Sequence, residues 1–274
     1  MRIENDGVGI ELDVHGDEGG PAVLLLHGFP DERSLWRHQV PALTGRGFRV
    51  VVPDQRGFGA SDKPPEVEAY SLPFLVGDVL AVLDGLGIER AHVVGHDWGA
   101  AVAWVTASLV PDRVDHLAAL SVGHPASFRT AGLAQREKSW YMLLFQFVGV
   151  AEQWLSEDGF RNMAEWSQHP DMDAVAARLG KDDGALTAAL NWYRANLTPE
   201  SLVGGPPPLP PIAAPTMGVW SDGDMALTER SMTGSADQVA GPWRYERIAG
   251  SGHWIPLEAP DALNALLLDF LPGG

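Results

Sequence analysis

An apolar segment, typical of a buried strand, leads directly into a turn with glycine on both sides. This junction restricts the fold more than any other part of the chain. We predict a strand over residues 91–96 and a helix from about 98 to 109. The turn between them reads GHDWG over residues 95–99. Small residues on both sides leave room for a sharp strand-to-helix elbow that presents a nucleophile at its tip. Aspartate is also a common helix N-cap, but a cap does not require flanking glycines, so we predict that Asp97 is the nucleophile.

Strands and helices alternate along the first part of the chain. After two antiparallel strands at the start, the apolar stretch AVLLLHG (22–28) is typical of a parallel strand that is covered on both faces. The alternation predicts an α/β fold with a mostly parallel, doubly wound sheet. The predicted strands cover residues 1–5, 9–17, 22–28, 48–54, 91–96 and 114–123, and the predicted helices cover about 32–44, 71–86 and 98–109.

A second kind of sequence interrupts this alternation. From roughly 125 to 203 the chain has helical spacing and many aromatic residues, and the glycine and proline residues at 204–211 predict a stiff, extended linker. Strands and a helix are then predicted again, at 215–224, 243–250 and about 260–271. We therefore predict one core, 1–124 and 212–274, with a helical cap inserted at 125–211.

Composition excludes several classes of protein. The chain of 274 residues is long enough for one substantial core. Its formal net charge of −17 repels phosphate backbones and anionic membranes, so we expect neither nucleic acid nor a membrane as a partner. The absence of cysteine excludes disulfides and thiolate chemistry. The polar N-terminus has no signal-peptide features and no apolar run is long enough to span a bilayer, so we expect a cytoplasmic monomer or homodimer.

A nucleophile of this kind needs a base and an acid that orients the base. His253 lies in the glycine-rich stretch GSGHW (250–254) after a predicted strand, and it comes last in the chain order nucleophile, acid, histidine. Two carboxylates follow the strand that ends at Trp220, namely Asp222 and Asp224. We choose Asp224 as the acid and keep Asp222 as the alternative.

Two backbone N–H groups are expected to stabilise a developing oxyanion. One belongs to Trp98, directly after the nucleophile, and the other belongs to Phe29 in the turn HGFP (27–30). A metal site is disfavoured because His92 and His96 are four residues apart on a predicted strand, which separates them by roughly 13 Å. We therefore expect no metal and no cofactor.

A carboxylate nucleophile indicates which bond is broken. Its attack on a carbonyl would give an anhydride, whereas its attack on a saturated carbon with a strained or good leaving group gives an alkyl ester on Asp97. His253 can then activate water against the ester carbonyl, which regenerates the aspartate. The reacting carbon is therefore expected to be sp3, as it is in epoxides and alkyl halides.

The leaving group distinguishes these two substrates. An epoxide oxygen needs a proton or a strong hydrogen bond as the ring opens, whereas a halide needs N–H donors. The chain has four tyrosines, and two of them, Tyr141 and Tyr193, lie in separate predicted helices of the cap, each after a tryptophan. Packing would explain one such tyrosine. Two of them above an elbow aspartate favour epoxide opening.

Six segments share one resemblance. They are HGFP (27–30), DQRGFGASD (54–62), GHDWGAAVAW (95–104), WYMLLFQFVGVAE (140–152), NWYRAN (191–196) and GHW (252–254). Together they resemble the soluble epoxide hydrolases of the α/β-hydrolase superfamily over nearly the whole chain. The resemblance implies an α/β-hydrolase fold, Tyr141 and Tyr193 as the ring-opening tyrosines, and Asp224 as the acid. The two cap segments are its specific part, since aspartate-nucleophile relatives share the elbow and HGFP.

Two alternatives compete with an epoxide hydrolase. Haloalkane or haloacid dehalogenases use the same nucleophile, and Trp98 could hold a halide. Haloalkane dehalogenases usually carry asparagine or tryptophan where this chain has Phe29 or cap residues, however, and fluoroacetate dehalogenases carry an arginine in place of Trp98. The second alternative is a catalytically silent binding protein of the same fold, which the presence of all the expected catalytic residues disfavours.

The expected substrate is an apolar or aryl epoxide, which water converts to a vicinal diol, because the walls of its pocket are expected to be apolar. Apolar side chains from the turn, the elbow and the cap are expected to line its pocket. These wall residues are Phe29, Trp98, Trp140, Leu144 and Phe145.

Overall fold

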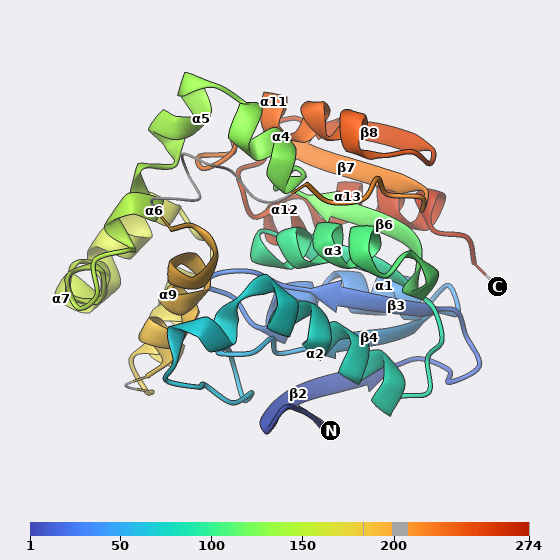
Figure 1. Cartoon of the computed structure of the whole chain (residues 1–274), viewed down its shortest axis with the longest axis horizontal. Coiled ribbons are helices and arrows are strands. Elements are labelled where there is room, and N and C mark those ends of the chain that lie inside the picture. The colour runs from blue at the N-terminus through green and yellow to red at the C-terminus, as the bar shows by residue number, and fades with distance from the viewer. Residues whose placement is uncertain (183, 199–207, 274) are drawn as a thin grey trace.

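The computed structural model of the chain describes residues 1–182, 184–198 and 208–273. Within these residues, eight strands form one sheet in the order β1-β2-β4-β3-β5-β6-β7-β8 (Figure 1). The pairs β1/β2 and β2/β4 are antiparallel, and all the pairs from β4/β3 to β7/β8 are parallel. The prediction of a mostly parallel sheet with antiparallel strands at the start is confirmed.

The strands follow the apolar segments of the sequence closely. Residues that alternate along β3 face opposite sides of the sheet: Leu24 and Leu26 pack into one apolar core, and Val23 and Leu25 pack into the other. Strands buried on both faces need apolar residues at every position, which explains the continuous run AVLLL. The strands are β1 (Arg2–Asn5), β2 (Val8–His15), β3 (Ala22–Leu26), β4 (Arg49–Pro53), β5 (Ala91–His96), β6 (Val114–Leu120), β7 (Thr216–Ser221) and β8 (Trp243–Ile248).

Helices cover both faces of the sheet, as a doubly wound fold requires. Helices α2 (Leu72–Gly85) and α3 (Trp98–Leu109) contribute buried residues to one core, and α1 (Gln39–Thr44) and α13 (Pro260–Phe270) contribute to the other (Figure 1). The remaining elements of the core are the short helices α11 (Glu229–Thr233) and α12 (Ile255–Glu258) and the 3-10 turns η1 (Arg33–Trp36), η2 (Val67–Tyr70), η3 (Pro111–Arg113) and η4 (Gly234–Gln238).

One predicted helix differs in the structure. The segment 32–44 forms the turn η1 and the short helix α1 instead of one helix. Proline has no backbone N–H and is tolerated only in the first turn of a helix, so Pro41 requires that a helix begin shortly before it. Helix α1 begins at Gln39 accordingly.

Between β6 and β7 the chain forms a series of helices (Figure 1). The first packs against α11, and the labelled helices after it lie beyond one end of the sheet. Backbone of non-helical conformation interrupts α7 at residues 157–160. Residue 183, the end of the predicted helical run and the first part of the predicted linker (199–207) lie outside the described residues. None of the described helices is long and apolar enough to cross a membrane. The helices are α4 (Pro125–Thr130), α5 (Leu133–Lys138), α6 (Trp140–Leu144), α7 (Val150–Ser167), α8 (Met172–Leu179) and α9 (Ala185–Asn196).

Candidate active site

Asp97 lies at the tip of a sharp turn between β5 and α3. Its backbone has φ 52° and ψ −123°, a conformation that non-glycine residues rarely adopt. A Cβ atom on Gly95 would overlap the carbonyl oxygen of Gly99, and a Cβ atom on Gly99 would overlap the carbonyl oxygen of Leu26. The two glycines of the GHDWG pattern are therefore required by the close approach of backbone within the elbow and between the elbow and β3.

The turn after β3 contacts the Asp97 carboxylate directly. The backbone N–H of Phe29 donates a 2.8 Å hydrogen bond to Asp97 Oδ1. Gly28 has no room for a side chain, because a Cβ atom there would overlap the same carboxylate. Trp98 is the first residue of α3, where helical N–H groups have no acceptor within the helix. The two amides that the sequence predicts for the oxyanion therefore lie next to Asp97, the candidate nucleophile.

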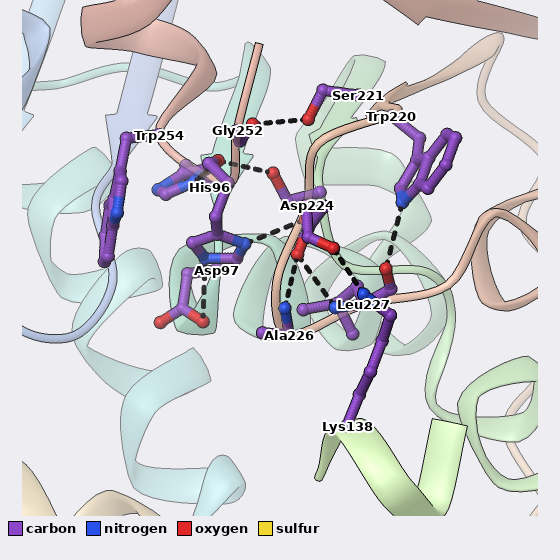
Figure 2. Close-up of polar contacts among 12 residues, drawn as sticks. His96, Asp97, Lys138, Trp220, Ser221, Asp224, Ala226, Leu227, Gly252 and Trp254 are labelled. Carbon is purple, nitrogen blue, oxygen red and sulfur yellow. Dashed lines mark hydrogen bonds and ion pairs between the residues drawn. The ribbon is translucent and has the colours of Figure 1, made fainter. Parts of the chain in front are cut away.

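His253 lies between the two carboxylates that the sequence selects. Its Nδ1 donates a 2.9 Å hydrogen bond to Asp224 Oδ2, and its Nε2 lies 3.6 Å from Asp97 Oδ2 (Figure 2). Asp224 is buried, whereas Asp222 lies at the surface and pairs with Arg247. The acid that contacts the histidine is thus Asp224 and not Asp222.

Neighbouring strands fix the backbone of His253. Ser121 Oγ and His96 Nε2 each donate a 2.9 Å hydrogen bond to its carbonyl oxygen. Burial lowers the pKa of His96 to about 4, so this ring is neutral at physiological pH. The histidine that precedes Asp97 therefore acts on the site as a hydrogen-bond donor, through the His253 backbone.

The charge of His253 depends on both carboxylates. Burial lowers the pKa of an imidazole, but Asp224 and then Asp97 act in the opposite direction and raise the pKa of His253 to about 10. The imidazole is therefore protonated at neutral pH. Neutralising Asp97 by esterification removes one of the two stabilising charges, so the imidazole can then lose its proton and serve as a base.

This dependence is testable with Asp97→Ala. We expect the pKa of His253 to fall below about 10, because only Asp224 then stabilises the imidazolium. An NMR titration of the imidazole signals, assigned by comparison with His253→Gln, measures the pKa. Asp222→Ala, which removes a surface carboxylate, is the control and should leave the pKa unchanged. An unchanged pKa in Asp97→Ala would contradict the assignment.

Two tyrosines of the cap lie close together near Asp97. The rings of Tyr141 on α6 and Tyr193 on α9 have centroids 6.1 Å apart, and both side chains are buried. Burial and the negative charge of Asp97 raise the pKa of both hydroxyls well above the usual range. Both phenols therefore keep their protons at neutral pH and can act as hydrogen-bond donors.

Trp98 orients one of these hydroxyls. The ring of Trp98 meets that of Tyr193 edge to face, with centroids 5.1 Å apart. Burial, Asp97 and Tyr141 raise the pKa of Tyr193, and a hydrogen bond from Trp98 acts in the opposite direction. Because an indole N–H can only donate, the Tyr193 oxygen is the acceptor and its own proton is free for a further partner.

Helix α9, which carries Tyr193, is fixed to the core by hydrogen bonds to backbone. Trp192 Nε1 donates to the carbonyl oxygen of Arg56 (2.9 Å), and Asn196 Nδ2 donates to that of Tyr70 (2.9 Å). The amide oxygen of Asn196 also accepts from the N–H of Leu72. The position of this tyrosine relative to the elbow is therefore set by contacts on both sides of it in the sequence.

Aromatic rings surround the tyrosines, and the predicted wall residues in this region differ in their burial. Phe145 is fully buried, with its ring 4.9 Å from that of Tyr193, and Leu144 is half-buried against the same core. Trp140, by contrast, is 45% exposed, and its ring packs against Trp154. Successive helical residues point about 100° apart, so burying Tyr141 turns its neighbour outward. The role of Trp140 as a wall residue stays a prediction.

The cap also holds ring partners that the sequence did not single out. The Trp166 ring lies 4.5 Å from that of Tyr141. His169 Nδ1 accepts from the Asp171 N–H, so its Nε2 donates the 3.2 Å hydrogen bond to Asp31 Oδ1, just beyond HGFP; its ring lies 4.2 Å from that of Trp254. Trp254 Nε1 in turn donates to the carbonyl oxygen of Ser167. The aromatic composition of 125–203 was the available signal, but it did not indicate which rings face the elbow.

Comparison with known proteins agrees with this geometry. The α/β hydrolase fold family matches residues 21–260. The chain is 34% identical to epoxide hydrolase A of Mycobacterium tuberculosis, over 99% of this chain and 96% of that protein. It is 32% identical to epoxide hydrolase 3 of Xenopus tropicalis, over 99% and 77% of the two chains.

Solved structures show the same similarity. An epoxide hydrolase found in metagenomes from hot environments has a TM-score of 0.90 and 32% identity, and the match covers 100% of this chain and 98% of that one. Epoxide hydrolase A from Mycobacterium thermoresistibile has a TM-score of 0.82 and 32% identity, with 99% and 97% coverage. By its fold, its elbow and these relatives, the chain belongs to the α/β-hydrolase fold family and, within it, to the epoxide hydrolases.

Proposed function

We propose that this chain converts an apolar or aryl epoxide to a vicinal diol through an ester formed on Asp97. The observation that carries the proposal is a buried pair of protonated tyrosines, Tyr141 and Tyr193, whose ring centroids lie 6.1 Å apart. They lie next to the carboxylate of Asp97, which contacts His253. Hydroxyl donors match an epoxide oxygen, which becomes strongly basic as the ring opens. The substrates are the epoxide and water, and the residues named require no metal or cofactor.

In the first step the carboxylate of Asp97 attacks a ring carbon. The new bond joins a carboxylate oxygen to this carbon, the carbon–oxygen bond of the ring breaks, and the leaving alkoxide takes a proton from the tyrosine pair. Asp97 Oδ1 already accepts a hydrogen bond from the Phe29 N–H, so Oδ2 is the oxygen we assign to the attack. Oδ1 then becomes the carbonyl oxygen of the ester.

In the second step water attacks the ester carbonyl carbon. His253, whose pKa falls when Asp97 is esterified, takes a proton from the water, and Asp224 stabilises the resulting imidazolium. The negative charge that develops on Oδ1 is stabilised by the N–H groups of Phe29 and Trp98. Collapse of the tetrahedral intermediate breaks the bond between the carbonyl carbon of Asp97 and the ester oxygen, and the leaving alkoxide takes the second proton of the attacking water, which regenerates the Asp97 carboxylate. The proton that His253 loses when Asp97 is esterified returns to the tyrosinate, so each group recovers its starting state.

The apolar substrate class follows from the rings around the tyrosines. Phe29, Trp98 and Phe145 all contact Tyr193, and Leu144 packs against the same core, so we retain these four residues as wall residues. The division into a core (1–124 and 212–274) and a cap (125–211), a cytoplasmic location and a monomeric or homodimeric state stay predictions.

A direct comparison of two substrates tests the proposal. The purified chain is incubated with styrene oxide and, separately, with 1-bromohexane, and diol and bromide are measured. We expect diol from the epoxide and little bromide from the haloalkane, because hydroxyl donors surround the nucleophile. Rapid bromide release without diol would establish a dehalogenase instead. No product from either substrate, with a folded protein, would support the silent binding protein.

A further inference from the structure

Helix α5 of the cap lies over the loop that carries the candidate acid. Gln135 is buried and contacts this loop at two residues: its Nε2 donates a 2.8 Å hydrogen bond to the carbonyl oxygen of Ala226, and its Oε1 accepts from the N–H (2.9 Å) and the hydroxyl (3.0 Å) of Thr228. One amide side chain thus satisfies three polar groups of the loop. Its buried position makes these bonds hard for water to replace.

A second side chain of the same helix reaches the acid itself. Lys138 Nζ donates a 2.6 Å hydrogen bond to the carbonyl oxygen of Asp224 (Figure 2). Lys138 is the last residue of α5, and Tyr141 follows three residues later on α6. The segment that contacts the acid loop therefore leads directly into one of the candidate ring-opening tyrosines.

The backbone of this loop decides where the acid carboxylate points. Asp224 Oδ1 accepts hydrogen bonds from the N–H groups of Ala226 and Leu227, both at 2.8 Å, and this leaves Oδ2 for His253. If the backbone at 226–228 shifts, the carboxylate turns with it, and the 2.9 Å contact with the histidine lengthens. From the cap side, Gln135 holds this backbone at Ala226 and Thr228, and Lys138 holds the carbonyl oxygen of Asp224 itself.

We propose that Gln135 and Lys138 are positioning residues for the second half of the reaction. They act through the loop that carries Asp224. The cap thus supplies the two tyrosines and also aligns the His253–Asp224 pair. This inference rests on the proposed function. It goes further by separating the two steps, because attack by Asp97 needs the tyrosines, whereas ester hydrolysis needs the aligned histidine.

The test measures the two steps separately. Wild-type protein and Gln135→Leu are mixed rapidly with styrene oxide, quenched at successive times, and analysed by intact-protein mass for the ester. We expect the rate of ester hydrolysis to fall by about ten- to a hundredfold in Gln135→Leu, because small misplacements of a catalytic group have effects of this size. The rate of ester formation should stay within about twofold, so the ester accumulates.

Matched variants distinguish positioning from a general loss of structure. Arg136→Leu, at an exposed position of the same helix, should leave both rates unchanged. Lys138→Met should slow hydrolysis, and Lys138→Arg, which keeps a donor, should restore most of it. Lys138 is only partly buried, so these two variants also serve if Gln135→Leu does not fold. Equal loss of both rates, or no loss of the hydrolysis rate, would overturn the inference.

The same experiment separates this inference from the proposed function. If wild type forms diol but the ester is never detected, even in His253→Gln, the proposed ester mechanism fails. If the ester forms and Gln135→Leu and Lys138→Met hydrolyse it at the wild-type rate, only the positioning inference fails.

Discussion

Asp97→Ala is expected to abolish diol formation from styrene oxide, with kcat reduced by at least about 10⁴-fold, the size seen when a covalent nucleophile is removed. Asp97 is the elbow residue that lies within reach of His253 and accepts the Phe29 N–H. Without its carboxylate no ester can form, and His253 loses the acyl group against which it would activate water. The measurement is initial-rate diol formation by chromatography.

The control for this prediction removes a different carboxylate. Asp222 pairs with Arg247 at the surface, so Asp222→Ala should retain near-normal activity. Alanine at a positive φ of 52° is strained by roughly 1–2 kcal/mol, and a thermal melt checks that the variant is still folded. Substantial diol formation by folded Asp97→Ala would refute the assigned nucleophile.

The double variant Tyr141→Phe/Tyr193→Phe is expected to lose epoxide opening while keeping its fold. Removing both hydroxyls deprives the leaving alkoxide of its proton donors, and general-acid effects of this kind amount to about 10³-fold. Both rings remain, so the packing against Phe145 and Trp166 is preserved. Each single variant keeps one donor and should lose less. Single-turnover ester formation is the quantity to measure, because it isolates the ring-opening step.

Two other tyrosines provide matched controls. Tyr70 donates its hydroxyl proton to the carbonyl oxygen of Pro64, and Tyr245 donates to Glu229, so neither hydroxyl serves the elbow. Tyr245→Phe should therefore form the ester at the wild-type rate. Ester formation by the double variant at a rate close to wild type would show that the cap tyrosines do not open the ring.

The elbow could be predicted from sequence because its requirements are local. The glycines at 95 and 99 are needed by backbone atoms within a few residues of Asp97 and in the adjacent strand β3. The parallel sheet could be predicted for a similar reason, since strands buried on both faces must be apolar at every position. Both features leave a pattern that a single sequence displays.

The choice between two nearby carboxylates could not be made this way. Asp222 and Asp224 lie two residues apart after β7, and chain order suits either of them. The structure separates them through bonds made by later residues: Asp224 is held by the N–H groups of Ala226 and Leu227, and Asp222 accepts from the N–H of Gly250. Such bonds depend on the conformation of the loops, and no repeating pattern in the sequence predicts that conformation.

The cap was the part least accessible to sequence reasoning. Its helices α5 and α6 have six and five residues, too few for periodicity to show which face is buried. The exposure of Trp140 was accordingly not foreseen, while Gln135 and Lys138 carried no signal at all. Their partners lie about 90 residues later in the chain, so only the folded arrangement brings them to the acid loop.

Intact-protein mass spectrometry of His253→Gln after incubation with styrene oxide tests the central claim most directly. Without the base the second step stalls, so the ester should remain on Asp97. We expect the protein mass to increase by that of the whole epoxide, with the modified peptide containing residue 97 and no such adduct in Asp97→Ala/His253→Gln. A folded His253→Gln protein that gains no mass while the wild type produces diol would contradict the covalent mechanism.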